Sequence, residues 1–382
     1  MRSDAKWRGA LRMLGFAAGC AGAIALASLA IVRGLDAAGE PLPYVDFDGM
    51  RSQFGVLRKL ERRNAADPEK RIAFLGDSTS MYFPNGAQAL DHQLGVALDA
   101  LAPAGSHFRM FSLAAPGYTQ FTQYFLSHRI ANARPDAVVI AFNLASFSNQ
   151  WREADRPKLA AWLPARHLGE AFRLPLHWIG LSIDELLIYT ATVSAGGFEL
   201  WRSLLHQQAR CVHAWASLAT WLQAHSGMPD GLAYLKLHYY QRRLAQYDVG
   251  PPQREKLELA RSRLGAVLAG VGPEHPVLRV LSATLAVFRE RGIPVFVYIA
   301  PINVEHLDRI GLRDREGLRR GVESVRRVVL AGGGVLIDAH DLLPDVAFED
   351  GGGHLLVNPA LDAHSIVAQK LAQEMLAAGR LR

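Results

Sequence analysis

Five short apolar segments, separated by stretches with helical periodicity, constrain the fold of this chain more than any other feature of its sequence. The segments lie at residues 71–75, 108–113, 137–142, 295–299 and 335–338. Each is shorter than a typical helix and strongly apolar, as expected of strands buried on both faces. Helical patterns lie at residues 86–101, 121–131, 277–291, 314–330 and 363–378. This alternation predicts an α/β fold in which helices cover both faces of a five-stranded parallel sheet.

The alternation is interrupted once, between residues 151 and 275. This interval has apolar residues at helical spacing and contains six of the seven tryptophans, which predicts a helical insertion. Its tryptophans either fill the insertion's own core or belong to a lid or a docking face for a membrane partner. The chain is therefore divided into an N-terminal tip and anchor at 1–35, a spacer at 36–70 that becomes helical near 50–64, an α/β domain at 71–150 and 276–382, and the insertion at 151–275.

The first 35 residues carry the pattern of a membrane anchor. Arg2, Lys6, Arg8 and Arg12 precede an uncharged run at residues 13–32, which is long enough to span a bilayer as a helix. Because basic flanks stay in the cytoplasm, the remainder of the chain is expected on the outer face of the cytoplasmic membrane, in the periplasm. Small residues at 25–27 leave signal-peptide cleavage as the alternative. The apolar run continues beyond them, which favours an uncleaved, single-pass signal anchor.

Charge and cysteine content exclude several other classes of protein. The formal net charge of +6 is spread along the 382 residues without a basic block, so no nucleic-acid partner is expected. The two cysteines, Cys20 in the predicted anchor and Cys211 in the insertion, offer no disulfide within the exported domain. No Cys/His group has zinc spacing, and the single glycine after the first strand lacks the phosphate-binding fingerprints. We therefore expect neither a metal nor a cofactor.

A serine follows the first predicted strand, in the run Gly76-Asp77-Ser78. Open parallel sheets build their sites at the carboxyl ends of their strands, and Gly76 permits a tight turn there. The second strand is followed by Gly117, and the third by Asn143. Three polar or glycine positions after successive strands predict a site at one edge of the sheet, with Ser78 as its nucleophile.

This order of motifs resembles the SGNH (GDSL-like) hydrolase family. The resemblance covers residues 71 to about 148 and 277 to the end, leaving the insertion outside it. It implies a three-layer, flavodoxin-like fold and an oxyanion hole formed by the backbone N–H groups of Ser78 and Gly117 and the amide of Asn143. Asp77 is then expected to hold the turn around the nucleophile. The sequence departs from the family pattern at Ala141, where glycine is usual, and at Leu144, where an acidic residue often follows.

A serine nucleophile needs an imidazole base, and an acid normally orients that imidazole. The family places the acid and the histidine three residues apart before the last helix. The nearest match is Asp350 and His354, which are separated by one residue more, within a run of three glycines. Two rivals remain open, His364 beside Asp362 and His340 beside Asp338.

Two functions from different classes are compatible with these residues. The first is a serine esterase or O-acyltransferase that forms an acyl-serine intermediate on acylated carbohydrate or another acyl ester. The predicted anchor favours transfer, because anchored SGNH-like proteins with an insertion resemble accessory proteins of membrane-bound O-acyltransferases in polysaccharide O-acetylation. The second is an inactive scaffold of the same fold that binds a glycan or a membrane O-acyltransferase. The enzyme is favoured because the family's residues are all present in the family's order, namely Gly76, Ser78, Gly117, Asn143 and a C-terminal histidine.

Overall fold

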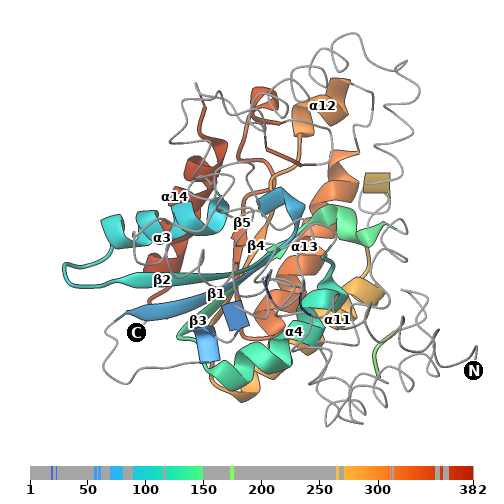
Figure 1. The fold of residues 1–382 in the computed structure, drawn as a ribbon. Coiled ribbons are helices and arrows are strands. Elements are labelled where there is room, and N and C mark those ends of the chain that lie inside the picture. Colours follow the sequence, from blue (N-terminus) through green and yellow to red (C-terminus); the bar gives the residue numbers. More distant parts are fainter. Residues whose placement is uncertain are drawn as a thin grey trace, which may run out of the picture.

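The structure of the chain, a computed structural model, has a parallel sheet at its centre (Figure 1). The described residues are 19, 23, 56–57, 59–61, 69–80, 89–114, 118–148, 173–175, 264–265, 271–309, 311, 314–348, 353–355 and 361–381. Nearly all of the predicted anchor, most of the spacer and nearly all of the predicted insertion lie outside them. Among the described residues, no helix is long and apolar enough to cross a membrane.

The predicted five-stranded parallel sheet is confirmed. Its strands are β1 Lys70–Gly76, β2 Phe108–Ala114, β3 Ala137–Phe142, β4 Val295–Ile299 and β5 Val335–Asp338. They lie in the order β2-β1-β3-β4-β5, and every neighbouring pair is parallel. β1 and β3 are adjacent, while the chain leaves β1 toward one side of the sheet and β3 toward the other. The sheet therefore has a topological switch point between β1 and β3.

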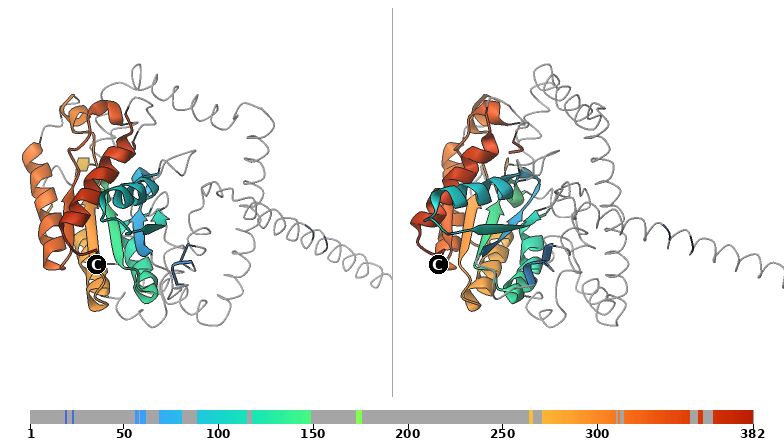
Figure 2. Two further views of the ribbon diagram at one scale, coloured as in Figure 1. Left: turned by 90° about the vertical axis from the view of Figure 1, so that its left-hand side faces the viewer. Right: turned by 60° about the vertical axis from the view of Figure 1, so that its left-hand side comes forward.

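Helices cover both faces of this sheet (Figures 1 and 2). α3 and α14 pack on one face with Phe74 and Tyr298, whereas α4, α11 and α13 pack on the other with Leu75 and Ile140. Alternate residues of each strand point to opposite faces, so each strand contributes to both cores. The helices are α3 Leu90–Leu101, α4 Gln120–Ala133, α11 Pro276–Glu290, α12 Val304–Arg309, α13 Arg315–Ala331 and α14 Ala363–Ala377.

The helix boundaries are close to those predicted, with three differences. The helix expected at 86–101 begins at Leu90, because Ala89 has an extended backbone. Asp314, expected inside α13, is instead its N-cap, and its carboxylate accepts a hydrogen bond from Gly317 N–H. Five of the predicted helices are therefore present, whereas the six-residue α12 was not predicted. Such a short helix contains less than two turns, which is too little for a periodic pattern.

Described parts of the spacer and insertion contact one face of the core. Leu57 and Leu60, within the helix expected at 50–64, are helical and buried against the α4 side. Leu264, within the predicted insertion, is completely buried in the same cluster, and Leu174 packs against it. One segment that precedes the α/β core in the sequence and one that interrupts it thus meet the face formed by α4, α11 and α13.

Candidate active site

The predicted site residues gather at the carboxyl edge of the sheet, beside the switch point. Ser78 follows the end of β1, and Asn143 follows the end of β3, which is the neighbouring strand. Connections that leave in opposite directions from adjacent parallel strands open a crevice between them. The first and third strands of the sequence pattern therefore bring their polar residues together.

The turn after β1 presents Ser78 on a compact, internally bonded backbone. Ser78–Ser80 form a 3-10 turn, in which Ser80 N–H and its hydroxyl both donate to the carbonyl of Asp77, at 3.2 and 2.9 Å. A Cβ atom on Gly76 would lie 2.2 Å from Ser80 Oγ and 3.1 Å from Ala114 Cβ. Any larger residue would displace the Ser80 side chain, whose hydroxyl bonds the Asp77 carbonyl, so the Gly76 of the sequence motif has a steric explanation.

Asp77 links the turn at Ser78–Ser80 to the end of β3 through hydrogen bonds. Its Oδ1 accepts hydrogen bonds from Thr79 N–H at 2.9 Å and from the Thr79 hydroxyl at 2.5 Å, and its Oδ2 accepts one from Asn143 Nδ2 at 3.1 Å. Asn143 Oδ1 accepts a hydrogen bond from Ala145 N–H at 2.9 Å, which fixes the orientation of the amide. The Nδ2 group of Asn143, which donates one N–H to Asp77, has a second N–H that can donate to another acceptor.

Ser78 and His354 are in direct contact. Ser78 Oγ lies 2.9 Å from His354 Nε2, although the two residues are 276 positions apart in the chain. Both side chains are only partly buried, so a substrate has access to them. With Nδ1 protonated, Nε2 is an acceptor for the serine proton, which is the geometry of a serine nucleophile and its general base.

Comparison with known proteins does not assign the chain to a family. No family model matches its sequence, and no curated protein matches it significantly. The functional interpretation therefore depends on the residues and geometry of the site.

The two rival histidines have other environments. His340 Nδ1 lies 2.6 Å from Asp338 Oδ1, directly after β5, and Asp338 also faces Arg326 at 3.6 Å. His364 lies in the first turn of α14 and is 1% exposed. Burial lowers the pKa of His364 to about 4. The imidazole that contacts Ser78 belongs to His354.

Two predicted residues, Gly117 and Asp350, lie outside the described residues. Within the described ranges, no group of His, Cys, Asp or Glu side chains is arranged to hold a metal ion. The site that the structure describes consists of Ser78, His354, Asp77 and Asn143.

A polar cluster beside the turn at Ser78–Ser80 was not predicted from the sequence. The Tyr298 hydroxyl is a hydrogen-bond partner of Ser80, and burial together with the charge of Asp77 raises the pKa of Tyr298. Removal from water likewise raises the pKa of Asp91, a hydrogen-bond partner of Ser112. Tyr298 lies within a strand whose pattern is otherwise apolar. No sequence signal distinguishes it from an ordinary core residue.

Two glutamines anchor the end of β3. Gln120 Nε2 and Gln123 Nε2 donate to the Ala141 carbonyl at 3.3 and 3.1 Å, and both side chains are buried. The pairing of β1 with β3 ends at Leu75 and Ile140, so the Ala141 carbonyl lies past the last paired residues of these two strands. Its pairing with α4 fixes the strand end two residues before Asn143.

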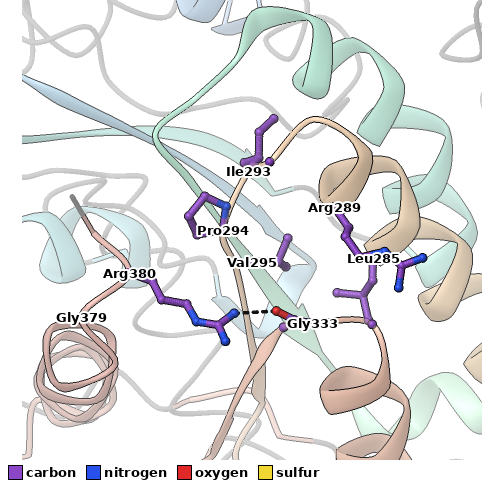
Figure 3. A pocket seen from close by; sticks show the side chains of 11 residues that line it. Leu285, Arg289, Ile293, Pro294, Val295, Gly333, Gly379 and Arg380 are labelled. Carbon is purple, nitrogen blue, oxygen red and sulfur yellow. Dashed lines mark hydrogen bonds between the residues drawn. The ribbon is translucent and has the colours of Figure 1, made fainter.

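A separate cavity lies at the opposite edge of the sheet. It has a volume of about 350 Å³ and is lined by the end of α11, the start of β4, the glycines before β5 and two residues near the C-terminus (Figure 3). Arg380 reaches across it and donates a hydrogen bond to the Gly333 carbonyl at 2.6 Å. None of the predicted site residues lines this cavity. The candidate site is therefore distinct from it.

Proposed function

We propose that this protein is a serine esterase or O-acyltransferase of the SGNH type, which forms an acyl intermediate on Ser78. The contact between Ser78 Oγ and His354 Nε2, at the carboxyl edge beside the switch point, is the observation that carries the proposal. A nucleophile and a base within hydrogen-bond reach, both partly accessible, are the minimum that acyl transfer requires.

The reaction follows from these two side chains. Ser78 Oγ attacks the acyl carbonyl carbon as its proton passes to His354 Nε2. The resulting imidazolium then gives this proton to the leaving oxygen as the ester bond breaks, which leaves the acyl group on Ser78. In the second half, His354 takes a proton from water or from a sugar hydroxyl, whose oxygen attacks the acyl-serine. Breakdown of that intermediate returns the proton to Ser78.

The negative charge that develops on the carbonyl oxygen requires fixed donors. The proposal assigns this task to the N–H groups of Ser78 and Gly117 and to the remaining N–H of Asn143 Nδ2. The two hydrogen bonds of Asn143 to Asp77 and Ala145 hold its amide in one orientation, which supports this role. Each such donor lowers the barrier by about 3 kcal/mol in well-studied acyl transferases. Asp350 is proposed as the acid that orients His354.

The cellular setting is also a proposal. The apolar run at 13–32 and its basic flank support a single-pass anchor in the cytoplasmic membrane, with the catalytic domain in the periplasm. That placement supports cell-envelope glycan or polysaccharide esters as substrates. It also supports a membrane-bound O-acyltransferase as the partner that supplies the acyl group.

A fluorophosphonate probe tests the nucleophile directly, since it reacts covalently with activated serines. The full chain in detergent is expected to be labelled and to hydrolyse p-nitrophenyl acetate. Ser78→Ala is expected to abolish labelling and to lower the hydrolysis rate by at least about 1,000-fold. Ser106→Ala, at a partly buried serine near the opposite edge, is the matched control and should retain both activities.

Histidine variants then assign the base. His354→Ala is expected to lower the labelling rate by about 1,000-fold. His340→Ala is expected to change it by less than about threefold, since substitutions away from a site alter free energies by about 0.5 kcal/mol. Well-folded protein that is not labelled would instead indicate the inactive scaffold.

A further inference from the structure

The residues on both sides of His354, Gly353 and Leu355, pack against other segments of the chain. The first support is a short strand bridge. Leu355, the next residue, forms an antiparallel bridge with Phe348. Both side chains are buried in the core on the α3 and α14 side of the sheet. The position of His354 therefore depends on the position of the segment that ends at Phe348.

That segment begins with a 3-10 turn, Asp345–Ala347, which is fastened to α12. Asp345 Oδ1 accepts hydrogen bonds from Asn303 Nδ2 and Arg309 Nη2, both at 2.7 Å, and its Oδ2 pairs with Arg309 Nη1. Asp345 N–H donates to Glu305 at 3.3 Å. We call Asn303, Arg309 and Asp345 the α12 clamp. The clamp joins the segment that ends at Phe348 to the helix that follows β4.

The residues of the clamp are themselves held in position by burial and by further hydrogen bonds. Asn303 is 4% exposed, and its Oδ1 accepts a hydrogen bond from His306 N–H at 2.9 Å, so the same side chain caps α12. Burial alone would raise the pKa of Asp345, but hydrogen bonds from Arg309 and Asn303 outweigh it and keep that pKa low. Asp345 is therefore ionised at neutral pH, with both carboxylate oxygens bonded.

A second support lies directly beside the histidine. Gly353 has a φ of +101°, and a Cβ atom there would lie 2.7 Å from the carbonyl oxygen of Pro301. Pro301 is two residues before Asn303, so Gly353 packs closely against the same connection after β4 that the clamp binds. This accounts for a glycine immediately before the histidine, in the run that is longer than the family spacing.

We propose that Asp345, held by Asn303 and Arg309, is a positioning residue that sets the place of His354 relative to Ser78, an inference that rests on the proposed function. The base reaches Ser78 from 276 residues away and has no regular strand or long helix of its own. Catalytic side chains must be held within about 0.5 Å of their working geometry, so a loop in this position needs rigid attachments. The Arg309 side chain is 59% exposed and that of Asp345 is 22% exposed, so their ion pair alone contributes little to stability, whereas the hydrogen bond from the buried Asn303 fixes the position of Asp345.

Two variants of Asp345 test the proposal in the full chain. Asp345→Ala is expected to lower kcat for p-nitrophenyl acetate and the rate of fluorophosphonate labelling by about 10- to 100-fold, with KM changed less than about twofold. Asp345→Asn keeps one oxygen for Asn303 and is expected to lose less activity. Glu316→Ala removes a carboxylate that accepts two hydrogen bonds from Arg319 on α13, and it should keep full activity.

A double-mutant cycle separates placement of the base from general loosening of the fold. In the His354→Ala background there is no base to misplace, so Asp345→Ala is expected to have no further effect on the slow residual labelling of Ser78. An equal loss in both backgrounds would overturn the positioning role. An unchanged labelling rate in Asp345→Ala, when His354→Ala lowers that rate by about 1,000-fold, would also overturn it, although the proposed function would then stand. If His354→Ala itself leaves labelling unchanged, the proposed base is wrong and this inference fails with it.

Discussion

At the scale of single residues, Asp77 fixes the positions of its neighbours through hydrogen bonds. Its two oxygens accept three hydrogen bonds, from Thr79 and Asn143, and link the ends of two strands. Each of these partners is a donor, which a carboxylate satisfies without rearrangement. The acidic residue of the Gly-Asp-Ser run therefore keeps the turn of the proposed nucleophile and the proposed oxyanion donor at a fixed separation.

Asp77→Asn should weaken this link at constant size. The new amide offers one oxygen to Thr79 and turns its NH₂ group toward the NH₂ group of Asn143, so one contact becomes repulsive. We expect kcat for p-nitrophenyl acetate to fall by about 10- to 100-fold, as for a misplaced oxyanion donor. Asp99→Asn, whose carboxylate accepts a hydrogen bond from Phe108 N–H away from the site, is the control. Full activity of Asp77→Asn would exclude this role.

At the scale of elements, the helices differ in how well the sequence predicts their surroundings. α13 has its buried residues at helical spacing, at Leu318, Val322, Val325 and Val329, so its inner face is evident from the sequence. α4 is buried on nearly all sides and carries buried polar residues, including Gln120 and Gln123. Its contacts with β3 arise from the tertiary structure, because a glutamine side chain has no preferred partner in the sequence.

His364 makes α14 sensitive to pH. Its pKa is about 4 in the folded chain, because of burial, against about 6.5 in an unfolded one. As the pH falls below 6.5, the unfolded state therefore binds the proton first. The stability present above pH 6.5 is lost progressively down to pH 4, by about 3 kcal/mol.

Denaturant unfolding at a series of pH values measures this effect. His364→Gln cannot ionise, so its stability is expected to fall less steeply than that of the unaltered chain between pH 6.5 and 4. His92→Gln, at an exposed position on α3, should reproduce the slope of the unaltered chain. Identical slopes for all three proteins would contradict a buried neutral His364.

At the scale of the whole molecule, Arg71 joins segments that are distant in the sequence. This side chain is 4% exposed, and its guanidinium donates to the Leu60 carbonyl at 2.6 Å and to the Arg134 and Ala133 carbonyls at 2.9 and 3.4 Å. Ala133 is the last residue of α4, where a cation also complements the helix dipole. One arginine of β1 thus holds both the end of α4 and the segment before the sheet.

Replacement of Arg71 should destabilise the fold substantially. Arg71→Met leaves buried carbonyl groups without their donors, and we expect the free energy of unfolding to fall by about 3 to 5 kcal/mol. Arg109 is the register partner of Arg71 on β2 and is 52% exposed, so Arg109→Met should cost less than about 1 kcal/mol. Equal losses in guanidinium unfolding would show that the buried hydrogen bonds of Arg71 contribute little.

The sequence by itself determined the strands, their parallel arrangement and the Gly-Asp-Ser turn, because these depend on local patterns. Short apolar segments and the Gly76-Asp77-Ser78 turn are encoded by neighbouring residues, and the predicted strands agree with the structure to within one residue at each end. Ser78 and Asn143 were predicted at one edge because parallel strands end at the same edge.

The tertiary structure alone decided which of three histidines meets Ser78 and what holds it there. His340, His354 and His364 each follow an acidic residue closely in the sequence, so local pattern cannot separate them. Only the folded chain places His354 Nε2 2.9 Å from Ser78 Oγ. The α12 clamp and the packing of Gly353 against Pro301 were likewise not predictable from the sequence, because each brings together residues about 36 to 52 positions apart. A contact across such a loop depends on the packing of the whole domain.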